Sequence, residues 1–159
     1  MNIYIAADHG GFELKKQIIY FLTASVELSK QLGALSITDV GPEVLDPTDD
    51  YPDFAFKTAI KVTEDPESIG ILICRSGNGM VIAANKVKGA YASLCFTETH
   101  ATKAREDDGS NILCLDADYE NAETHQKIIK AFLTSKTLTE DRFQRRFLKV
   151  QDWENDHLN

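Results

Sequence analysis

The segment that decides the fold is residues 69–79, which read IGILICRSGNG. The apolar run from Ile69 to Cys74 is typical of a β-strand that is buried on both faces. Gly77 and Gly79 follow at once, and helical periodicity then continues through Lys86. A buried strand that passes through a glycine-rich turn into a helix indicates one β–α unit of a parallel sheet.

The same alternation extends over the rest of the chain. Strands are predicted at residues 2–7, 35–40, 69–74, 90–95 and 111–115, and helices around residues 14–22, 55–62, 77–86, 97–107, 125–132 and 143–150. Five strand–helix units in strict alternation predict an α/β fold, a Rossmann-like three-layer sandwich with a five-stranded parallel sheet. The C-terminal helix has no later strand to cross to, so it packs on its own sheet or on a partner subunit. Residues 1–159 are predicted to form a single domain.

Composition excludes several classes of function. The 159 residues carry a formal net charge of -8, which argues against nucleic acid or an anionic membrane as a partner. We expect no signal sequence and no membrane span, because the N-terminal stretch has no basic region before a long apolar run and no apolar run is long enough to span a membrane. Three widely spaced cysteines in apolar runs indicate free thiols in a reducing compartment, so we expect a cytoplasmic protein. Without pairs of Cys or His at metal-binding spacing, we expect no metal and no cofactor.

Reactive residue types follow the predicted strands. In parallel sheets ligands bind beyond the carboxyl ends of the strands. Asp8 and His9 follow the first strand, Tyr51 ends the loop after the second, and residues 74–79 end the third. We therefore expect these residues to meet at one edge of the sheet.

The segment of residues 74–79, which ends the third predicted strand, suggests a site for acid–base chemistry. Backbone N–H groups at a helix start are partly positive, so they stabilise an oxyanion and favour the thiolate form of a nearby cysteine. A Cys74 thiolate beside such a turn is suited to taking a proton from a carbon next to a carbonyl. The alternative is that Cys74 is a small buried apolar residue.

Five other positions have two interpretations each. Asp8 and His9 are predicted to contact a substrate oxygen, with Asp8 fixing the tautomer of His9, or else to be a helix cap and a solvated histidine. Arg142 and Arg146 share one helix face and suit a bidentate grip on phosphate, or else form an ordinary solvated basic face. Tyr51 is a substrate contact or half-buried packing.

Five stretches together resemble the type B ribose-5-phosphate isomerases and the related galactose-6-phosphate isomerase subunits: residues 6–15, 50–55, 70–74, 76–80 and 82–87. The resemblance implies Cys74 as the catalytic base and Ser76 as the hydroxyl that returns the proton. It implies a backbone oxyanion hole at Gly77, Asn78 and Gly79. Asp8, His9 and Tyr51 match substrate contacts, and Arg142 and Arg146 match phosphate-gripping arginines. It also implies a metal-free homodimer or tetramer with active sites shared between subunits.

The chain departs from the family pattern at four positions. The usual His-Asn pair becomes Asp107 and Asp108, which places an aspartate at the position of the ring-opening histidine. A family arginine falls on Asp118, and a usual glycine is Arg75, which is a candidate phosphate contact. For ring opening the choice is between Asp107, His9 and no catalysis. Met80 stands where one branch of the family has a glutamate base, so the chain fits the cysteine branch.

The expected activity is the isomerisation of ribose 5-phosphate and ribulose 5-phosphate through an enediolate. Two alternatives stay open. One is an isomerase for another, six-carbon sugar phosphate, and the other is a non-catalytic subunit that binds a sugar phosphate.

Overall fold

Five parallel strands form the centre of the computed structural model, which describes residues 1–136 and 140–158. The strands are β1 (Asn2–Ala7), β2 (Ser36–Asp39), β3 (Ile69–Cys74), β4 (Ala92–Leu94) and β5 (Ile112–Asp116), in the spatial order β2-β1-β3-β5-β4. Every strand pair is parallel. The predicted five-stranded parallel sheet is confirmed. β3 lies in its middle, where both faces are covered, and this explains its unbroken apolar sequence.

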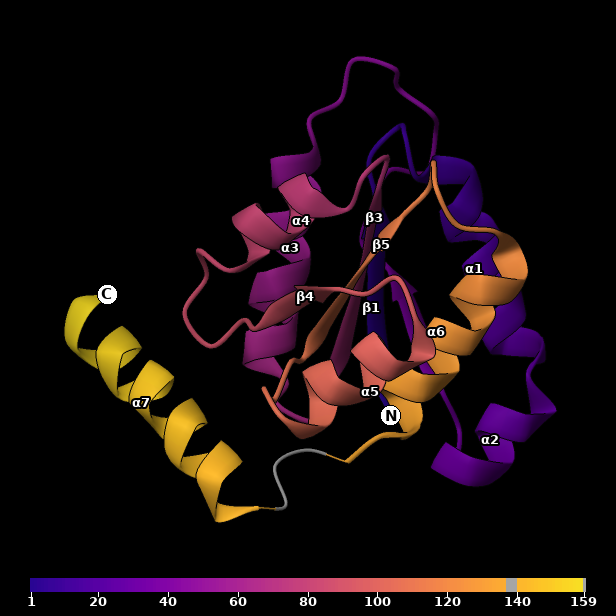
Figure 1. Cartoon of the computed structure of the whole chain (residues 1–159). Helices are drawn as coiled ribbons and strands as arrows, with labels where there is room; N and C mark the ends of the chain where they lie inside the picture. The colour runs from indigo at the N-terminus through magenta and orange to yellow at the C-terminus, as the bar shows by residue number, and fades with distance from the viewer. Residues whose placement is uncertain (137–139, 159) are drawn as a thin grey trace.

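Helices cover both faces of the sheet (Figure 1). One face carries α1 (Phe12–Ala24), α2 (Val26–Leu32), α5 (Glu98–Glu106) and α6 (Ala122–Thr134), and the other carries α3 (Tyr51–Glu64) and α4 (Asn78–Ala84). Two clusters of buried apolar side chains fill the two interfaces. Because successive residues of a strand point to opposite faces, Ile71 and Ile73 enter one cluster while Leu72 and Cys74 enter the other. The three-layer sandwich is therefore confirmed.

One helix interrupts the predicted alternation. The apolar pattern predicts no element between the helix at 14–22 and the strand at 35–40, but α2 occupies Val26–Leu32. Ser25 has an extended backbone that ends α1, and its side chain accepts a hydrogen bond from the N–H of Leu28 at 3.3 Å, which starts α2. Leu28 is buried and anchors this helix to the core. The pattern misses it because one apolar anchor in seven residues shows no period.

The C-terminal helix α7 (Asp141–His157) stands beside the three-layer body (Figure 1). Its contacts with the body begin at Tyr91, just before β4. The ring of Tyr91 meets that of Phe147 edge to face at 4.7 Å, and its hydroxyl donates to Glu154 at 2.6 Å. Burial, followed by this hydrogen bond, raises the pKa of Tyr91 to about 12. Leu148 and Trp153 leave more than half of their surface exposed, so α7 keeps an apolar face outside the body of its own chain.

Within residues 1–136 and 140–158, every helix is too short or too polar to cross a lipid bilayer.

Candidate active site

The turn after β3 brings a thiol to the start of a helix. Cys74 is buried, and its Sγ accepts a hydrogen bond from the backbone N–H of Gly77 at 3.1 Å. Gly77 has a φ of +75°, in the left-handed region, and a Cβ there would lie 3.2 Å from the carbonyl oxygen of Leu115. Only glycine takes this conformation without strain. The glycine therefore turns the chain so that an N–H group of the helix start faces the sulfur.

Neighbouring elements close the sides of this turn. Asp116, at the end of β5, is in register with Cys74, and the N–H of Ala117 donates to the carbonyl of Cys74 at 2.9 Å. On the other side the ring of Tyr51 lies against Gly79, since a Cβ on Gly79 would meet that ring at 2.8 Å. The structure thus brings Tyr51 from the start of α3 to the turn of residues 74–79, as the strand-end argument predicts.

The end of β1 contributes a histidine that a carboxylate holds. The Nδ1 atom of His9 lies 2.7 Å from Oδ1 of Asp49, and the same oxygen accepts the backbone N–H of His9 at 2.9 Å. The expectation that Asp8 fixes the tautomer is wrong. Oδ1 of Asp8 accepts instead from the N–H of Gly11 at 3.1 Å, and burial raises the pKa of Asp8. Asp8 therefore stabilises the turn into α1, while Asp49 holds the ring of His9.

Arg75 and Asp118 form an ion pair at the same edge of the sheet. The Nε atom of Arg75 lies 3.0 Å from Oδ2 of Asp118, and the aliphatic part of Arg75 crosses Gly10. Two of the four positions that depart from the family pattern therefore contact each other. The guanidinium has four further N–H groups, which this contact does not use.

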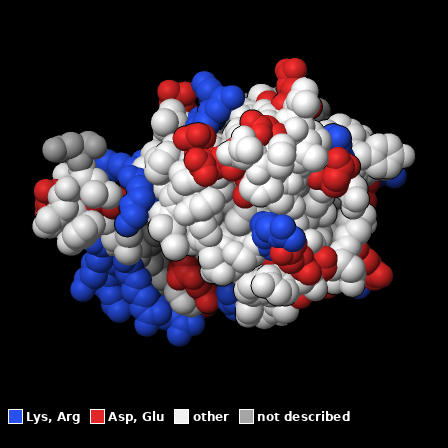
Figure 2. Space-filling view, turned by 90° about the horizontal axis from the view of Figure 1, so that it is seen from above, with Lys and Arg blue, Asp and Glu red and all other residues white. Residues whose placement is uncertain are grey.

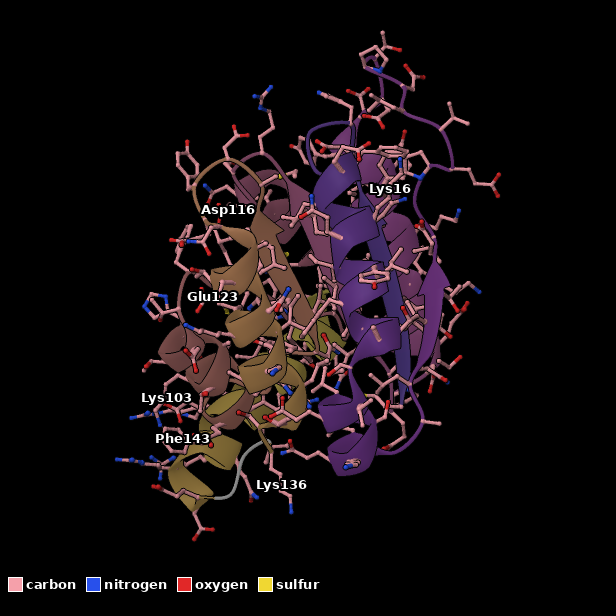
Figure 3. The ribbon with its side chains drawn as sticks, turned by 90° about the vertical axis from the view of Figure 1, so that its right-hand side faces the viewer. Lys16, Lys103, Asp116, Glu123, Lys136 and Phe143 are labelled. Atoms are coloured by element: carbon pink, nitrogen blue, oxygen red, sulfur yellow. The ribbon has the colours of Figure 1, made fainter. Side chains whose placement is uncertain are left out.

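The remaining predicted residues lie at the opposite end of the molecule. α5 runs back from the carboxyl end of β4, so Asp107 and Asp108, which follow α5, come near the amino ends of the strands. Together with Tyr91 and Arg146 they line a hollow of about 140 Å³. Figure 3 shows the same separation, because Lys103 of α5 and Phe143 of α7 lie low in that view while Asp116 lies high. Within one chain Asp107 and the Arg142–Arg146 pair are not brought to Cys74.

Basic side chains gather on α7. This helix carries Arg142, Arg145, Arg146 and Lys149, and in Figure 2 the largest group of Lys and Arg side chains in view lies beside the body on the side of α7. The guanidinium groups of Arg142 and Arg146 lie 4.5 and 6.0 Å from the ring centre of Phe143. An acidic protein therefore presents a local cationic surface that suits a phosphate group.

No cluster of three or more His, Cys, Asp or Glu side chains with a geometry for metal binding occurs in the described part of the chain.

Comparison with known proteins identifies the family. The family model described as Ribose/Galactose Isomerase matches residues 3–150. The chain belongs to the ribose/galactose isomerase family. It is 44% identical to the probable ribose-5-phosphate isomerase B of Mycoplasma pneumoniae, over 84% of this chain and 83% of that protein. It is 36% identical to the ribose-5-phosphate isomerase B of Mycobacterium tuberculosis, over 99% of this chain and 92% of that protein.

The fold agrees with solved members of the family. The crystal structure of ribose-5-phosphate isomerase B from Mycoplasma genitalium with bound ribulose-5-phosphate matches with a TM-score of 0.87 and 41% identity. The match covers 98% of this chain and 97% of that one. The resemblance noted from the sequence motifs is thereby confirmed.

Sequence reasoning missed one residue of the site, Asp49. The only signal was its place in the loop that ends at Tyr51, where Asp49 and Asp50 are adjacent and equally plausible partners.

Proposed function

We propose that this chain is an aldose–ketose isomerase that interconverts ribose 5-phosphate and ribulose 5-phosphate. The observation that carries the proposal is the hydrogen bond from the N–H of Gly77 to Sγ of Cys74, which places a thiol at a donor-rich helix start. Donors aimed at a developing oxyanion stabilise the transition state of proton abstraction. The activity named for the relatives, and the ligand in the Mycoplasma genitalium structure, support ribose 5-phosphate as the substrate.

The proposed reaction moves one proton from C2 to C1 of the substrate. The Cys74 thiolate takes the proton from C2 of the open-chain aldose. Negative charge then develops on O1, where the backbone amides of Gly77, Asn78 and Gly79 stabilise it. The proton returns to C1, while Ser76 carries the proton of the O2 hydroxyl to O1. C2 becomes the ketone, and neither a metal nor a redox cofactor takes part.

We propose that the complete site forms between two subunits, in a homodimer or tetramer. The half with the thiol lies at the carboxyl edge of the sheet, and the half with Asp107, Asp108 and the α7 arginines lies at the amino end. The amino-end half of one chain would therefore complete the carboxyl-edge half of another. Exposed apolar side chains on α3 and α4 (Phe56, Ile60 and Ile82) and on α7 (Leu148 and Trp153) offer surface for such an association.

We also propose that the enzyme works in the cytoplasm, because its three cysteines are free thiols in the structure.

A six-carbon sugar phosphate is the second candidate substrate. The Arg75–Asp118 ion pair stands where the family pattern has a glycine and an arginine. A change of charge at a binding site alters which anions and chain lengths it accepts.

A panel of aldose 5- and 6-phosphates, assayed for ketose formation, tests the proposal. Ribose 5-phosphate is expected to give the highest kcat/KM, and EDTA is expected to leave the rate unchanged. A six-carbon substrate with the highest kcat/KM would replace ribose 5-phosphate. Binding without turnover of any member would indicate a non-catalytic subunit, and a rate lost with EDTA and restored by a divalent ion would overturn the metal-free mechanism.

A further inference from the structure

One carboxylate oxygen holds both the backbone and the ring of His9. Oδ1 of Asp49 accepts the His9 N–H at 2.9 Å and lies 2.7 Å from Nδ1 of the ring. The Asp49 side chain is 10% exposed, whereas that of His9 is 36% exposed. Two contacts with one carboxylate oxygen fix both the position of the residue and the rotation of its ring.

This contact decides which ring nitrogen meets a ligand. A carboxylate accepts only from a protonated nitrogen, so Nδ1 of His9 carries hydrogen toward Asp49. Nε2, on the other side of the ring, is left for substrate. It is an acceptor when the ring is neutral and a donor when the ring is charged.

The loop that supplies Asp49 is fixed at its base. Lys15, of which 1% is exposed, donates from Nζ to Oδ1 of Asp39 at 2.9 Å and to the carbonyl of Pro42 at 2.8 Å. Nearer its tip, the N–H of Asp49 donates to the carbonyl of Asp46 at 3.2 Å. Asp49 therefore approaches β1 on an anchored segment, which reduces the entropy that must be lost to hold His9.

Three carboxylates face His9. Asp49 bonds it directly, while Asp8 and Asp46 act on it through charge. The hydrogen bond to Asp49 is the largest cause that raises the pKa of His9. Across Gly10 lies Arg75, whose own charge is paired with Asp118. The net surroundings of the ring favour the imidazolium.

We infer that Asp49 is a positioning residue that presents His9 as a charged donor, through Nε2–H, to an anionic oxygen of the substrate. The inference rests on the proposed function for the identity of that substrate. Asp49 itself contacts His9 and acts through it.

Replacement of the carboxylate by an amide tests the inference with little disturbance of shape. In Asp49→Asn the side-chain oxygen can still accept the His9 N–H, but the charge is gone. NMR titration of the His9 ring, assigned with His9→Gln, is expected to show a midpoint lower by about one pH unit. Asp46→Asn is the matched control, because Asp46 lies in the same loop and bonds Thr48 instead of His9. Its effect on the midpoint is expected to be much smaller.

Kinetics supply the second readout. A raised pKa keeps His9 charged to higher pH, so the KM for ribose 5-phosphate in the parent should rise only above the His9 midpoint. In Asp49→Asn that rise should begin at lower pH, because the ring of His9 loses its charge at lower pH. Asp49→Ala, which removes both bonds, should raise KM about tenfold.

An unchanged His9 midpoint in Asp49→Asn, or an equal shift in Asp46→Asn, would overturn the inference. The titration does not depend on turnover. If the parent isomerised no aldose phosphate, the proposed function would fail, and the His9 midpoint would still decide whether Asp49 controls the ring.

Discussion

The three cysteines differ in what surrounds each sulfur. Burial raises the pKa of Cys95 to about 12 and that of Cys114 well above its ordinary value, so both stay thiols near neutral pH. The sulfur of Cys74 alone among them receives an N–H group from a helix start within the described chain. We therefore expect the chemical role of Cys74 to differ from that of Cys95 and Cys114.

Cys74→Ala is expected to lower kcat by about 10² or more, which is the usual contribution of a general base. The protein should keep its fold, because the change removes one sulfur at the end of a strand. Cys95→Ala and Cys114→Ala are the controls, and they should change thermal stability while keeping kcat. Ketose formation and thermal unfolding of the three variants give the answer, and full activity in Cys74→Ala would remove it as the base.

Arg75 is a second residue whose role can be separated by substitution. Its charge is paired with Asp118, but the pair is exposed and water screens it. Arg75→Gly is expected to raise the KM for ribose 5-phosphate about fivefold. Asp118→Asn frees the guanidinium and should leave KM equal or lower. If Arg75→Gly leaves KM unchanged, Arg75 is a surface residue that forms an ion pair with Asp118 and does not contact the substrate.

Residues that act through local geometry were predictable from sequence, and those held by distant partners were not. Cys74 and Gly77 are three residues apart, so the turn that joins them is formed by neighbouring residues of the sequence. Asp49 and His9 are 40 residues apart and meet through a loop whose path no periodicity describes. The sequence offered Asp8 as the nearest carboxylate to His9, and proximity along the chain proved misleading.

At the scale of elements, the periodic spacing of apolar residues predicts the strands and most of the helices. β3 was predicted at its observed bounds, because burial on both faces leaves an unbroken apolar run. α2 was missed because Leu28 is its one buried residue, and a single buried position shows no periodic pattern. The place of α7 was left open for a physical reason: a helix with no strand after it has no topological rule to place it, and its docking depends on the Tyr91 contacts.

The end of α5 raises the question of ring opening. Asp107 follows this helix, its carboxylate lies 3.5 Å from Nζ of Lys103, and it shares a hollow with Arg146. A carboxylate can accept the proton of a ring hydroxyl. We expect Asp107→Asn to slow turnover of ribose 5-phosphate strongly, and His100→Ala on the same helix to have little effect.

The matched measurement uses an aldose phosphate that cannot cyclise. Its turnover by Asp107→Asn should remain close to that of the parent, because no ring has to open. Equal rates of Asp107→Asn and parent on the cyclising substrate would take Asp107 out of the mechanism.

At the scale of the whole molecule, the candidate site is divided. The thiol and His9 follow strand ends at the carboxyl edge of the sheet, and Asp107 shares a hollow with Arg146 of α7 near the amino end. No side chain spans the length of a sheet, so one chain cannot bring both halves to one substrate. Two chains can, if the amino end of each meets the carboxyl edge of the other. In a two-fold dimer this arrangement gives two equivalent sites.

Mixing two inactive variants tests this arrangement. Cys74→Ala lacks the base but keeps α7, and the double variant Arg142→Ala, Arg146→Ala keeps the base but lacks the phosphate grip. In a mixed dimer one site receives both defects and the other receives none. After equal amounts exchange subunits at random, about a quarter of the parent's sites should be intact, and ketose formation should rise to that level. Each variant mixed with itself provides the control. Mass spectrometry verifies that subunits have exchanged in the 1:1 mixture. If exchange has occurred but activity stays at the level of the separate variants, each site is built from one chain.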